Sequence, residues 1–192
     1  MRIGLDIDGC MYQWDKTARY MLREVLPDSP YSHDGPLGRI SEHWDYIQKH
    51  VTAEHWKWLW TEGVRLGLFR HGHLFPGAVQ AARALAEIGD VVAITHRPKA
   101  AVSDTLAWLS FQQLPLSGVH LLTGQEPKST VHPQCDVYLD DKPENCVDLK
   151  DHTRGVVAVM SRPWNESWVN EDYAIKRVYD WPEFVAWVRG LK

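Results

Sequence analysis

The sequence predicts an α/β fold with a mainly parallel sheet and a small helical insertion after the first strand. Short apolar runs alternate with helical patterns along most of the chain, which is the order of a βαβ protein. Several of these runs end in polar side chains that could form a site. The alternation is interrupted over residues 15–75, where no strand-like run stands out.

Five short apolar runs predict strands, at residues 2–7, 90–95, 118–122, 136–140 and 155–160. Apolar periodicity and capping signals predict helices at about 77–88, 99–112, 143–149 and 181–190. Gly89 is placed to end the first of these helices. Asp180, with Glu183 three residues later, is a capping-box arrangement at the start of the last helix.

The interrupted region predicts a helical cap over residues 15–75, with residues 1–14 and 76–192 forming the α/β core. A helical stretch at 16–26 leads into a loop rich in Pro, Gly and Ser at 27–38, and a helical region with many aromatic residues follows. Because the insertion begins directly after the first strand, we expect it to lie over the site like a lid.

Composition indicates a compact enzyme in the cytoplasm. The 192 residues suffice for one domain and a small insertion, and the formal net charge of −4 argues against a long nucleic acid as partner, though not against a single nucleotide. No apolar run is long enough to span a bilayer, and the first strand begins too early to leave room for a cleaved signal. The three cysteines are odd in number and lack metal-ligand spacing, which predicts reduced thiols.

Two carboxylates, Asp6 and Asp8, follow the first predicted strand. Residues i and i+2 of a strand face the same way, so continued strand geometry would crowd two like charges. That arrangement costs free energy unless a cation or a proton compensates it. A turn at Gly9 could instead splay the pair toward a substrate and a leaving group. Taken alone, such a pair is more often a solvated loop feature.

Three further segments favour a site. Thr95 ends one predicted strand, Lys128 lies in a turn after another, and Asp140 and Asp141 end a third. The carboxyl ends of parallel strands meet at one edge of the sheet, where open α/β folds bind ligands. Oxygen ligands favour a hard cation, so four carboxylates with one hydroxyl and one ammonium suit magnesium-assisted phosphoryl chemistry. Thr95 alone could equally be a helix cap, and Lys128 alone would be a solvated surface lysine.

Tryptophan is unusually abundant, with ten residues in the chain. Four of them fall within seventeen positions: Trp44, Trp56, Trp58 and Trp60. Most tryptophans are buried in cores, and the helical spacing of Trp56 and Trp60 favours packing for that pair. Trp14 is different because its position ties it to the acidic turn. An aromatic face beside a phosphate site could stack on a nucleobase, which contributes about 1–3 kcal/mol per base.

The ordered motifs resemble those of the haloacid dehalogenase superfamily of phosphatases. Within it, the chain is most similar to the 5′(3′)-deoxyribonucleotidases, the cytosolic and mitochondrial pyrimidine type and their phage and bacterial relatives. The matching segments are Asp6 to Trp14, Phe69, Phe75 to Ala78, Thr95, Lys128, Leu139 to Lys142, and Trp164 with Asn165. The resemblance implies the haloacid dehalogenase fold, a Rossmann-like three-layer sandwich with a mainly parallel sheet and a small helical cap.

The resemblance also implies a mechanism, and the chemistry of these residues is consistent with it even without the resemblance. Asp6 would attack phosphorus and form an aspartyl-phosphate, while Asp8 would protonate the leaving oxygen and later deprotonate water. Mg²⁺ would be held by Asp6, the backbone carbonyl of Asp8, and Asp141. Asp140 would orient a metal-bound water, although the adjacent pair leaves open which of the two aspartates binds the metal directly.

The remaining family positions imply substrate contacts from Thr95, Lys128, Trp14, Phe69 and His96. Three departures from the family pattern are visible. Cys10 replaces a valine or threonine, His96 stands where relatives often carry serine, and Glu126 stands where relatives can carry arginine. His96 and Glu126 would lie near the phosphate or sugar, so the preferred base and sugar stay open.

The expected function is magnesium-dependent hydrolysis of (deoxy)ribonucleoside monophosphates. One alternative is a phosphatase of the same superfamily that acts on another small phosphorylated metabolite or a polynucleotide end. Another is a non-catalytic binding protein, which would be expected to have lost Asp6 or Asp8. The histidines, including His71 and His73, show no spacing for a zinc centre. The expected partner is a small-molecule nucleoside monophosphate, and we expect the protein to bind neither a membrane nor a long nucleic acid. A homodimer is one option for the oligomeric state.

Overall fold

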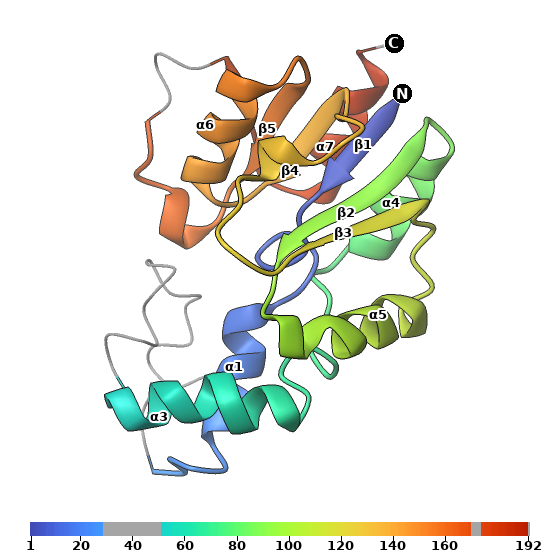
Figure 1. The fold of residues 1–192 in the computed structure, drawn as a ribbon. Helices are drawn as coiled ribbons and strands as arrows, with labels where there is room; N and C mark the ends of the chain where they lie inside the picture. Colours follow the sequence, from blue (N-terminus) through green and yellow to red (C-terminus); the bar gives the residue numbers. More distant parts are fainter. Residues whose placement is uncertain (29–50, 170–173, 192) are drawn as a thin grey trace.

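A six-stranded parallel sheet forms the centre of the protein (Figure 1). The computed structural model describes residues 1–28, 51–169 and 174–191. The strands are β1 (Arg2–Leu5), β2 (Asp90–His96), β3 (Gly118–Leu122), β4 (Val137–Asp140), β5 (Val156–Met160) and β6 (Ile175–Val178). Their order, β3-β2-β1-β4-β5-β6, is that of a Rossmann-like sheet and places β1 between β2 and β4.

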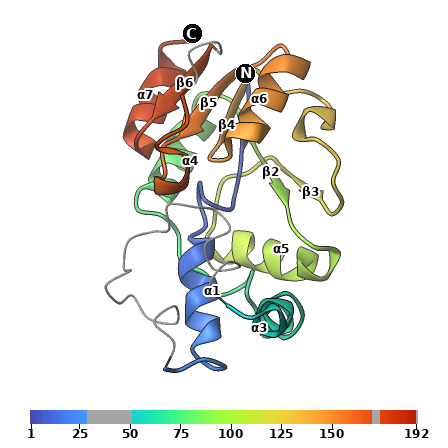
Figure 2. The same ribbon diagram turned by 90° about the vertical axis from the view of Figure 1, so that its left-hand side faces the viewer.

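Helices cover both faces of the sheet, which confirms the predicted three-layer α/β class (Figure 2). The core helices are α4 (Ala78–Ala86), α5 (Val102–Phe111), α6 (Pro143–His152) and α7 (Trp181–Arg189). Alternate residues of each strand face opposite sides. Val91 and Ala93 of β2 therefore join the cluster that contains α4, α5 and α7, whereas Val92 and Ile94 join the cluster that contains α6.

Four of the five predicted strands match within one residue at each end, and the first strand ends two residues early, at Leu5. The sequence prediction missed β6, because Lys176 and Arg177 interrupt its two buried residues, Ile175 and Val178. The helix predicted at 143–149 continues to His152.

Gly89 has a different role from the predicted one, because α4 already ends at Ala86. A Cβ atom at Gly89 would lie 2.0 Å from the carbonyl oxygen of Met1, which also accepts a hydrogen bond from the backbone N–H of Asp90 (2.9 Å). The glycine therefore permits the close approach of two strand beginnings. At α7 the predicted cap is present in modified form. Asp180 accepts from the N–H of Glu183, but the Glu183 carboxylate accepts from Tyr179.

The described helices between β1 and α4 lie beyond the carboxyl edge of the sheet (Figure 1). These helices are α1 (Trp14–Leu22) and α3 (Ala53–Trp58), which continues into a π-helical turn, η1 (Leu59–Gly63). The predicted helix at 16–26 thus begins and ends earlier. Most of the predicted Pro/Gly/Ser-rich loop, and Trp44, lie outside the described residues. Among the described residues, no helix is both long and apolar enough to cross a lipid bilayer.

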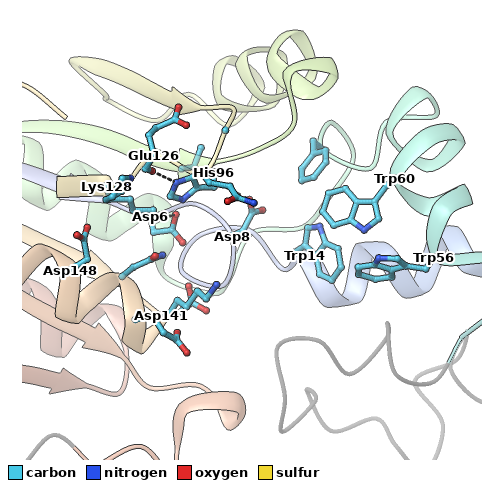
Figure 3. A pocket seen from close by; sticks show the side chains of 18 residues that line it. Asp6, Asp8, Trp14, Trp56, Trp60, His96, Glu126, Lys128, Asp141 and Asp148 are labelled. Carbon is cyan, nitrogen blue, oxygen red and sulfur yellow. Dashed lines mark hydrogen bonds and ion pairs between the residues drawn. The ribbon is translucent and has the colours of Figure 1, made fainter. Parts of the chain in front are cut away.

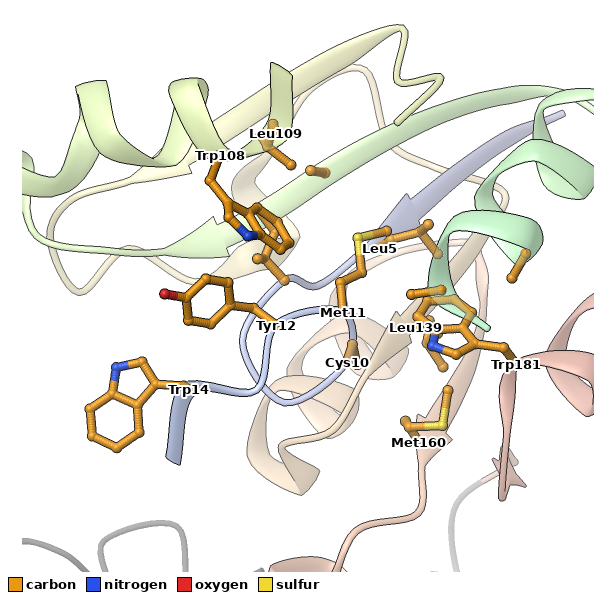
Figure 4. Close-up of a cluster of buried hydrophobic side chains, with 14 of the residues drawn as sticks. Leu5, Cys10, Met11, Tyr12, Trp14, Trp108, Leu109, Leu139, Met160 and Trp181 are labelled. Atoms are coloured by element: carbon orange, nitrogen blue, oxygen red, sulfur yellow. The ribbon is translucent and has the colours of Figure 1, made fainter. Parts of the chain in front are cut away.

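Two linkers, residues 6–13 and residues 64–77, connect these helices to the α/β core, and backbone hydrogen bonds hold them side by side. The N–H of Gln13 donates to the carbonyl of His73 (2.9 Å), and the N–H of Phe75 donates to the carbonyl of Met11 (2.7 Å). Helix α5 fixes the pair from the core side, since Trp108 donates from Nε1 to the carbonyl of Gly72 (2.9 Å). The Trp108 ring also packs edge-on against Tyr12 of the first linker (Figure 4).

Candidate active site

The acidic turn after β1 separates the two carboxylates that the sequence places two positions apart. Backbone N–H groups of Met11 and Tyr12 both donate to the carbonyl of Ile7, which closes a tight turn. Gly9 has φ +83, and a Cβ atom there would lie 2.2 Å from Oδ2 of Asp141. The turn therefore needs glycine for both its backbone conformation and its closeness to Asp141. Of the two arrangements the sequence allows, the structure shows the splayed pair.

Lys128 binds two of the aspartates. It opens a short 3₁₀ turn, η3 (Lys128–Thr130), and its Nζ donates to Oδ1 of Asp6 and Oδ2 of Asp140, each at 2.6 Å. Burial by itself would lower the pKa of Lys128, but the carboxylates of Asp140 and Asp6 outweigh it and raise the pKa. The ammonium group therefore stays charged and compensates part of the negative charge of the acidic cluster, which consists of Asp6, Asp8, Asp140 and Asp141.

The adjacent pair at the end of β4 has two distinct environments. Besides Lys128, Asp140 accepts from the N–H of Lys142 (2.9 Å) and from Asn145. Asp141 instead accepts a hydrogen bond at Oδ2 from Nε1 of Trp164 (2.7 Å). Among the described residues, no lysine or arginine forms an ion pair with Asp141.

Asp6 and Asp141 carry incompletely compensated charge. Burial, followed by the carboxylates of Asp140 and Asp8, raises the pKa of Asp6 to about 7 against the opposing effect of Lys128. Burial and the neighbouring carboxylates also raise the pKa of Asp141 well above its ordinary range. Two buried carboxyl groups of this kind require a proton or a cation.

The donors around these carboxylates could hold a metal ion. One ligand atom each of Asp6, Cys10 and Asp141 lies within 4.8 Å of the other two. The sequence spacing of the cysteines gave no sign that Cys10 lies beside these two carboxylates. Burial and Asp141 raise the pKa of this thiol well above its ordinary value, which favours the neutral thiol. The two carboxylates are the stronger ligands and suit a hard cation.

The end of β2 contributes a hydroxyl and an imidazole. Thr95 is fully buried, and its Oγ1 donates to Oδ2 of Asp8 at 3.4 Å. His96 donates from Nε2 to the carbonyl oxygen of Glu126 (2.8 Å), which joins the end of β2 to the loop that precedes Lys128.

Arg97 is a site residue that the sequence analysis missed. Its guanidinium binds the Asp8 carboxylate through two hydrogen bonds, from Nε to Oδ2 (2.8 Å) and from Nη2 to Oδ1 (2.7 Å). The signal was its position two residues after Thr95, which places both side chains on the same side of an extended segment. A second unpredicted contact comes from Arg162, which donates to the carbonyls of Gly9 (2.6 Å) and Cys10 (3.3 Å).

A cavity of about 560 Å³ joins the acidic cluster to a group of aromatic rings (Figure 3). Its aromatic wall is formed by Trp14, Trp56, Trp60 and Phe69, and its opposite end by Asp6, Asp8, Thr95, His96, Lys128 and Asp141. The cavity thus brings together every predicted catalytic, substrate-binding and direct metal-binding residue. Asp140 is not among its lining residues.

Trp14 belongs to this aromatic wall and is itself well packed. Only 6% of Trp14 is exposed, and its ring stacks on Trp60 with centroids 5.8 Å apart. Trp56 and Trp60 contact each other edge to face at 5.6 Å, which confirms the packing predicted from their helical spacing. The wall is therefore a pre-formed apolar surface at the opposite end of the cavity from the buried aspartates.

The raised pKa of Asp6 predicts how the stability of the metal-free protein depends on pH. Between the ordinary value of 3.8 and about 7, the folded protein retains a proton that the unfolded chain releases. The free energy of unfolding should therefore fall as pH rises through this window. Urea denaturation in chelator at pH 5, 6 and 7 should show a smaller decline for Asp6→Asn than for the parent protein. Equal declines would contradict the assignment.

Comparison with known proteins identifies the family of this chain. The family described as "5' nucleotidase, deoxy (Pyrimidine), cytosolic type C protein" matches residues 1–189. "Putative nucleotidase OB0422" of Oceanobacillus iheyensis is 24% identical over 96% of this chain and 97% of its own length. "Putative nucleotidase BH1399" of Halalkalibacterium halodurans is also 24% identical, over 97% of this chain and 92% of its own length.

Solved structures show the same fold at low sequence identity. A haloacid dehalogenase-like hydrolase, SP0104 of Streptococcus pneumoniae, has a TM-score of 0.65 and 13% identity, with 97% of each chain covered. The L-2-haloacid dehalogenase PA0810 has a TM-score of 0.62 and 12% identity, covering 97% of this chain and 98% of its own. The expected haloacid dehalogenase fold is thereby confirmed. The chain belongs to the deoxy (pyrimidine), cytosolic type C family of 5′-nucleotidases and is a phosphoric monoester hydrolase.

Proposed function

We propose that this enzyme hydrolyses (deoxy)ribonucleoside monophosphates to nucleoside and phosphate, with Mg²⁺ as cofactor. The observation that carries the proposal is the single cavity with a buried acidic cluster at one end and an aromatic wall at the other. A phosphate group needs the first end and a nucleobase suits the second. Membership of a nucleotidase family supports the same substrate class.

Asp6 is the proposed nucleophile. Lys128 binds Oδ1 of Asp6 at 2.6 Å and so orients the carboxylate. An Asp6 oxygen would form a bond to phosphorus while the bond from phosphorus to the nucleoside oxygen breaks, which leaves an aspartyl-phosphate. Asp8 would protonate the departing oxygen, then take a proton from the water that displaces phosphate from Asp6. Thr95 would donate to a phosphoryl oxygen.

The metal proposal rests on the two carboxylates that share the cluster with incomplete compensation. Asp6 and Asp141 would hold Mg²⁺ together with the backbone carbonyl of Asp8, and Asp140 would act through its contacts with Lys128 and Asn145. The cation would supply charge compensation for phosphate and lower the pKa of both carboxyl groups. A structural neighbour, the hydrolase YfnB of Bacillus subtilis, is described as bound to magnesium, which supports the same choice.

The segment at residues 15–75 is proposed to act as a cap over a core made of residues 1–14 and 76–192. Its described helices lie beyond the carboxyl edge of the sheet, where the acidic cluster is. Three of the four rings of the aromatic wall, those of Trp56, Trp60 and Phe69, belong to this segment. Phe69 and His96 are the proposed neighbours of the sugar. The enzyme is expected to work in the cytoplasm, since its three cysteines are free and buried.

A substrate panel with two aspartate variants tests the chemistry. The parent enzyme should hydrolyse nucleoside monophosphates faster than sugar phosphates or phosphorylated polynucleotide ends. Asp6→Asn should lose turnover, because it removes the nucleophile with little change in volume. Asp8→Asn should lower kcat about 10²–10⁴-fold and accumulate an acid-stable phosphoryl-enzyme. Turnover close to that of the parent in folded Asp6→Asn would exclude the covalent route.

Metal removal tests the cofactor. Activity should disappear in excess chelator and return with Mg²⁺. Ca²⁺ should inhibit, because its larger and looser coordination shell allows carboxylates to bind it bidentately and spoils in-line attack. Calorimetric titration should detect Mg²⁺ binding to the parent protein, and Asp141→Asn should weaken it. Full activity in excess chelator would contradict the proposal.

Trp14 tests the substrate class. Replacing it with leucine should weaken nucleotide binding by about 1–3 kcal/mol if the ring stacks on a base. The loss should appear in kcat/KM for nucleotides but not for acetyl phosphate, which has no ring. Trp58→Leu is the matched control, because Trp58 belongs to α3 but does not line the cavity. An unchanged ratio of the two specificity constants in a folded Trp14→Leu protein would remove the nucleobase from the proposal.

A further inference from the structure

We propose that Arg97 is the positioning residue for Asp8, and that the two linkers, residues 6–13 and 64–77, hold Arg97 in place. Asp8 would then be oriented for proton transfer only while those linkers are packed against the sheet. The inference rests on the proposed function of Asp8 as acid and base.

The ion pair between Arg97 and Asp8 fixes the plane of the carboxylate. Both Asp8 oxygens accept from the guanidinium, at 2.7 and 2.8 Å, and this two-point contact sets direction as well as distance. A lysine would supply charge but only a single point of contact. The geometry thus accounts for an arginine at this position.

Arg97 acts through Asp8, because its side chain is closed to a ligand. The exposed fraction of the Arg97 side chain is 0%, compared with 11% for Asp8, and Arg97 does not line the cavity. Its third nitrogen, Nη1, donates to Oγ1 of Thr105 in α5 (3.1 Å). A phosphate group in the cavity would therefore meet Asp8 but not the guanidinium.

The guanidinium contacts one aromatic ring from each of the two linkers. Its carbon is 4.7 Å from the ring centroid of Tyr12 in the first linker and 4.7 Å from that of Phe69 in the second. Trp108 of α5 lies 5.9 Å away and holds the second linker through its hydrogen bond to Gly72. Arginine stacks favourably on aromatic faces, so these rings select one guanidinium orientation.

This arrangement connects the aromatic wall to the acidic cluster through one chain of contacts. Phe69 lines the cavity, packs 6.1 Å from Trp60, and also contacts Arg97. Moving either linker would displace a ring from the guanidinium and release the Asp8 carboxylate from its fixed plane. Proton transfer by Asp8, in the turn after β1, would then depend on how the second linker packs against the first.

A double-mutant cycle tests the first half of the proposal. Arg97→Met should lower kcat for nucleoside monophosphates about 10²-fold, the range expected for loss of a proton-transfer group, and change KM less than about 3-fold. In an Asp8→Asn background the same substitution should cost no further activity, because Arg97 acts only through Asp8. The kcat of Arg97→Lys should lie between those of the parent enzyme and Arg97→Met. If Arg97→Met does not fold, Arg97→Lys takes its place in the cycle.

Arg19→Met is the matched control for losing a buried arginine, since Arg19 pairs with Asp15 on α1. It should lower the melting temperature without the selective loss in kcat. Additive effects of the Arg97 and Asp8 substitutions, or an unchanged kcat in folded Arg97→Met, would overturn the proposal. If the parent enzyme hydrolyses no nucleotide, the proposed function fails separately, and the same cycle is measured with para-nitrophenyl phosphate.

Tyr12 tests the second half. Tyr12→Leu removes the aromatic ring that contacts the Arg97 guanidinium. It should lower kcat in the enzyme that retains Asp8, but should cause no further loss of kcat in the Asp8→Asn variant. Tyr12→Phe keeps the ring and should have a smaller effect, limited to the lost hydrogen bond to Leu68. Equal losses of kcat for the two variants at matched folded fractions would show that the ring does not hold Arg97.

Discussion

Four aspartates are buried together at one edge of the sheet, and the need to compensate their charge organises the structure around them. Burying a carboxylate is costly unless it is paired. Asp140 and Asp6 both form ion pairs with Lys128, and Asp8 forms an ion pair with Arg97. These pairings use both buried cations of the cluster. What remains is the charge of Asp6 and Asp141, and the proposed cation would bind there.

The sheet order decides where these charges meet. Because β1 lies between β2 and β4, the turn after β1 is flanked by the end of β2 on one side and by Asp140 and Asp141 on the other. Apolar layers cover both faces of the sheet and hold the strand ends in place. A site built on such rigid elements keeps its geometry without support from a bound ligand. Short segments such as the turn at Gly9 then bring the backbone close to the Asp141 side chain.

The helices of residues 15–75 complete the site in a different way. They contribute flat apolar rings instead of charges, so the cavity is polar at one end and aromatic at the other. Each linker places one aromatic ring, Tyr12 or Phe69, against Arg97. The junction between the two parts of the chain therefore lies at the ion pair of Arg97 with Asp8, the residue to which proton transfer is assigned in the proposed function.

The sequence alone determined the fold class, five of the strands and the order of the polar strand ends, because buried parallel strands form continuous apolar runs and their carboxyl ends share one edge. It could not reveal β6, whose charged residues hide two buried ones. Only the tertiary structure decided the pairing of Arg97 with Asp8, 89 positions away, and the place of Cys10 beside Asp141, 131 positions away. Sequence patterns report local periodicity, whereas the partner of a buried charge is chosen by which strands become neighbours.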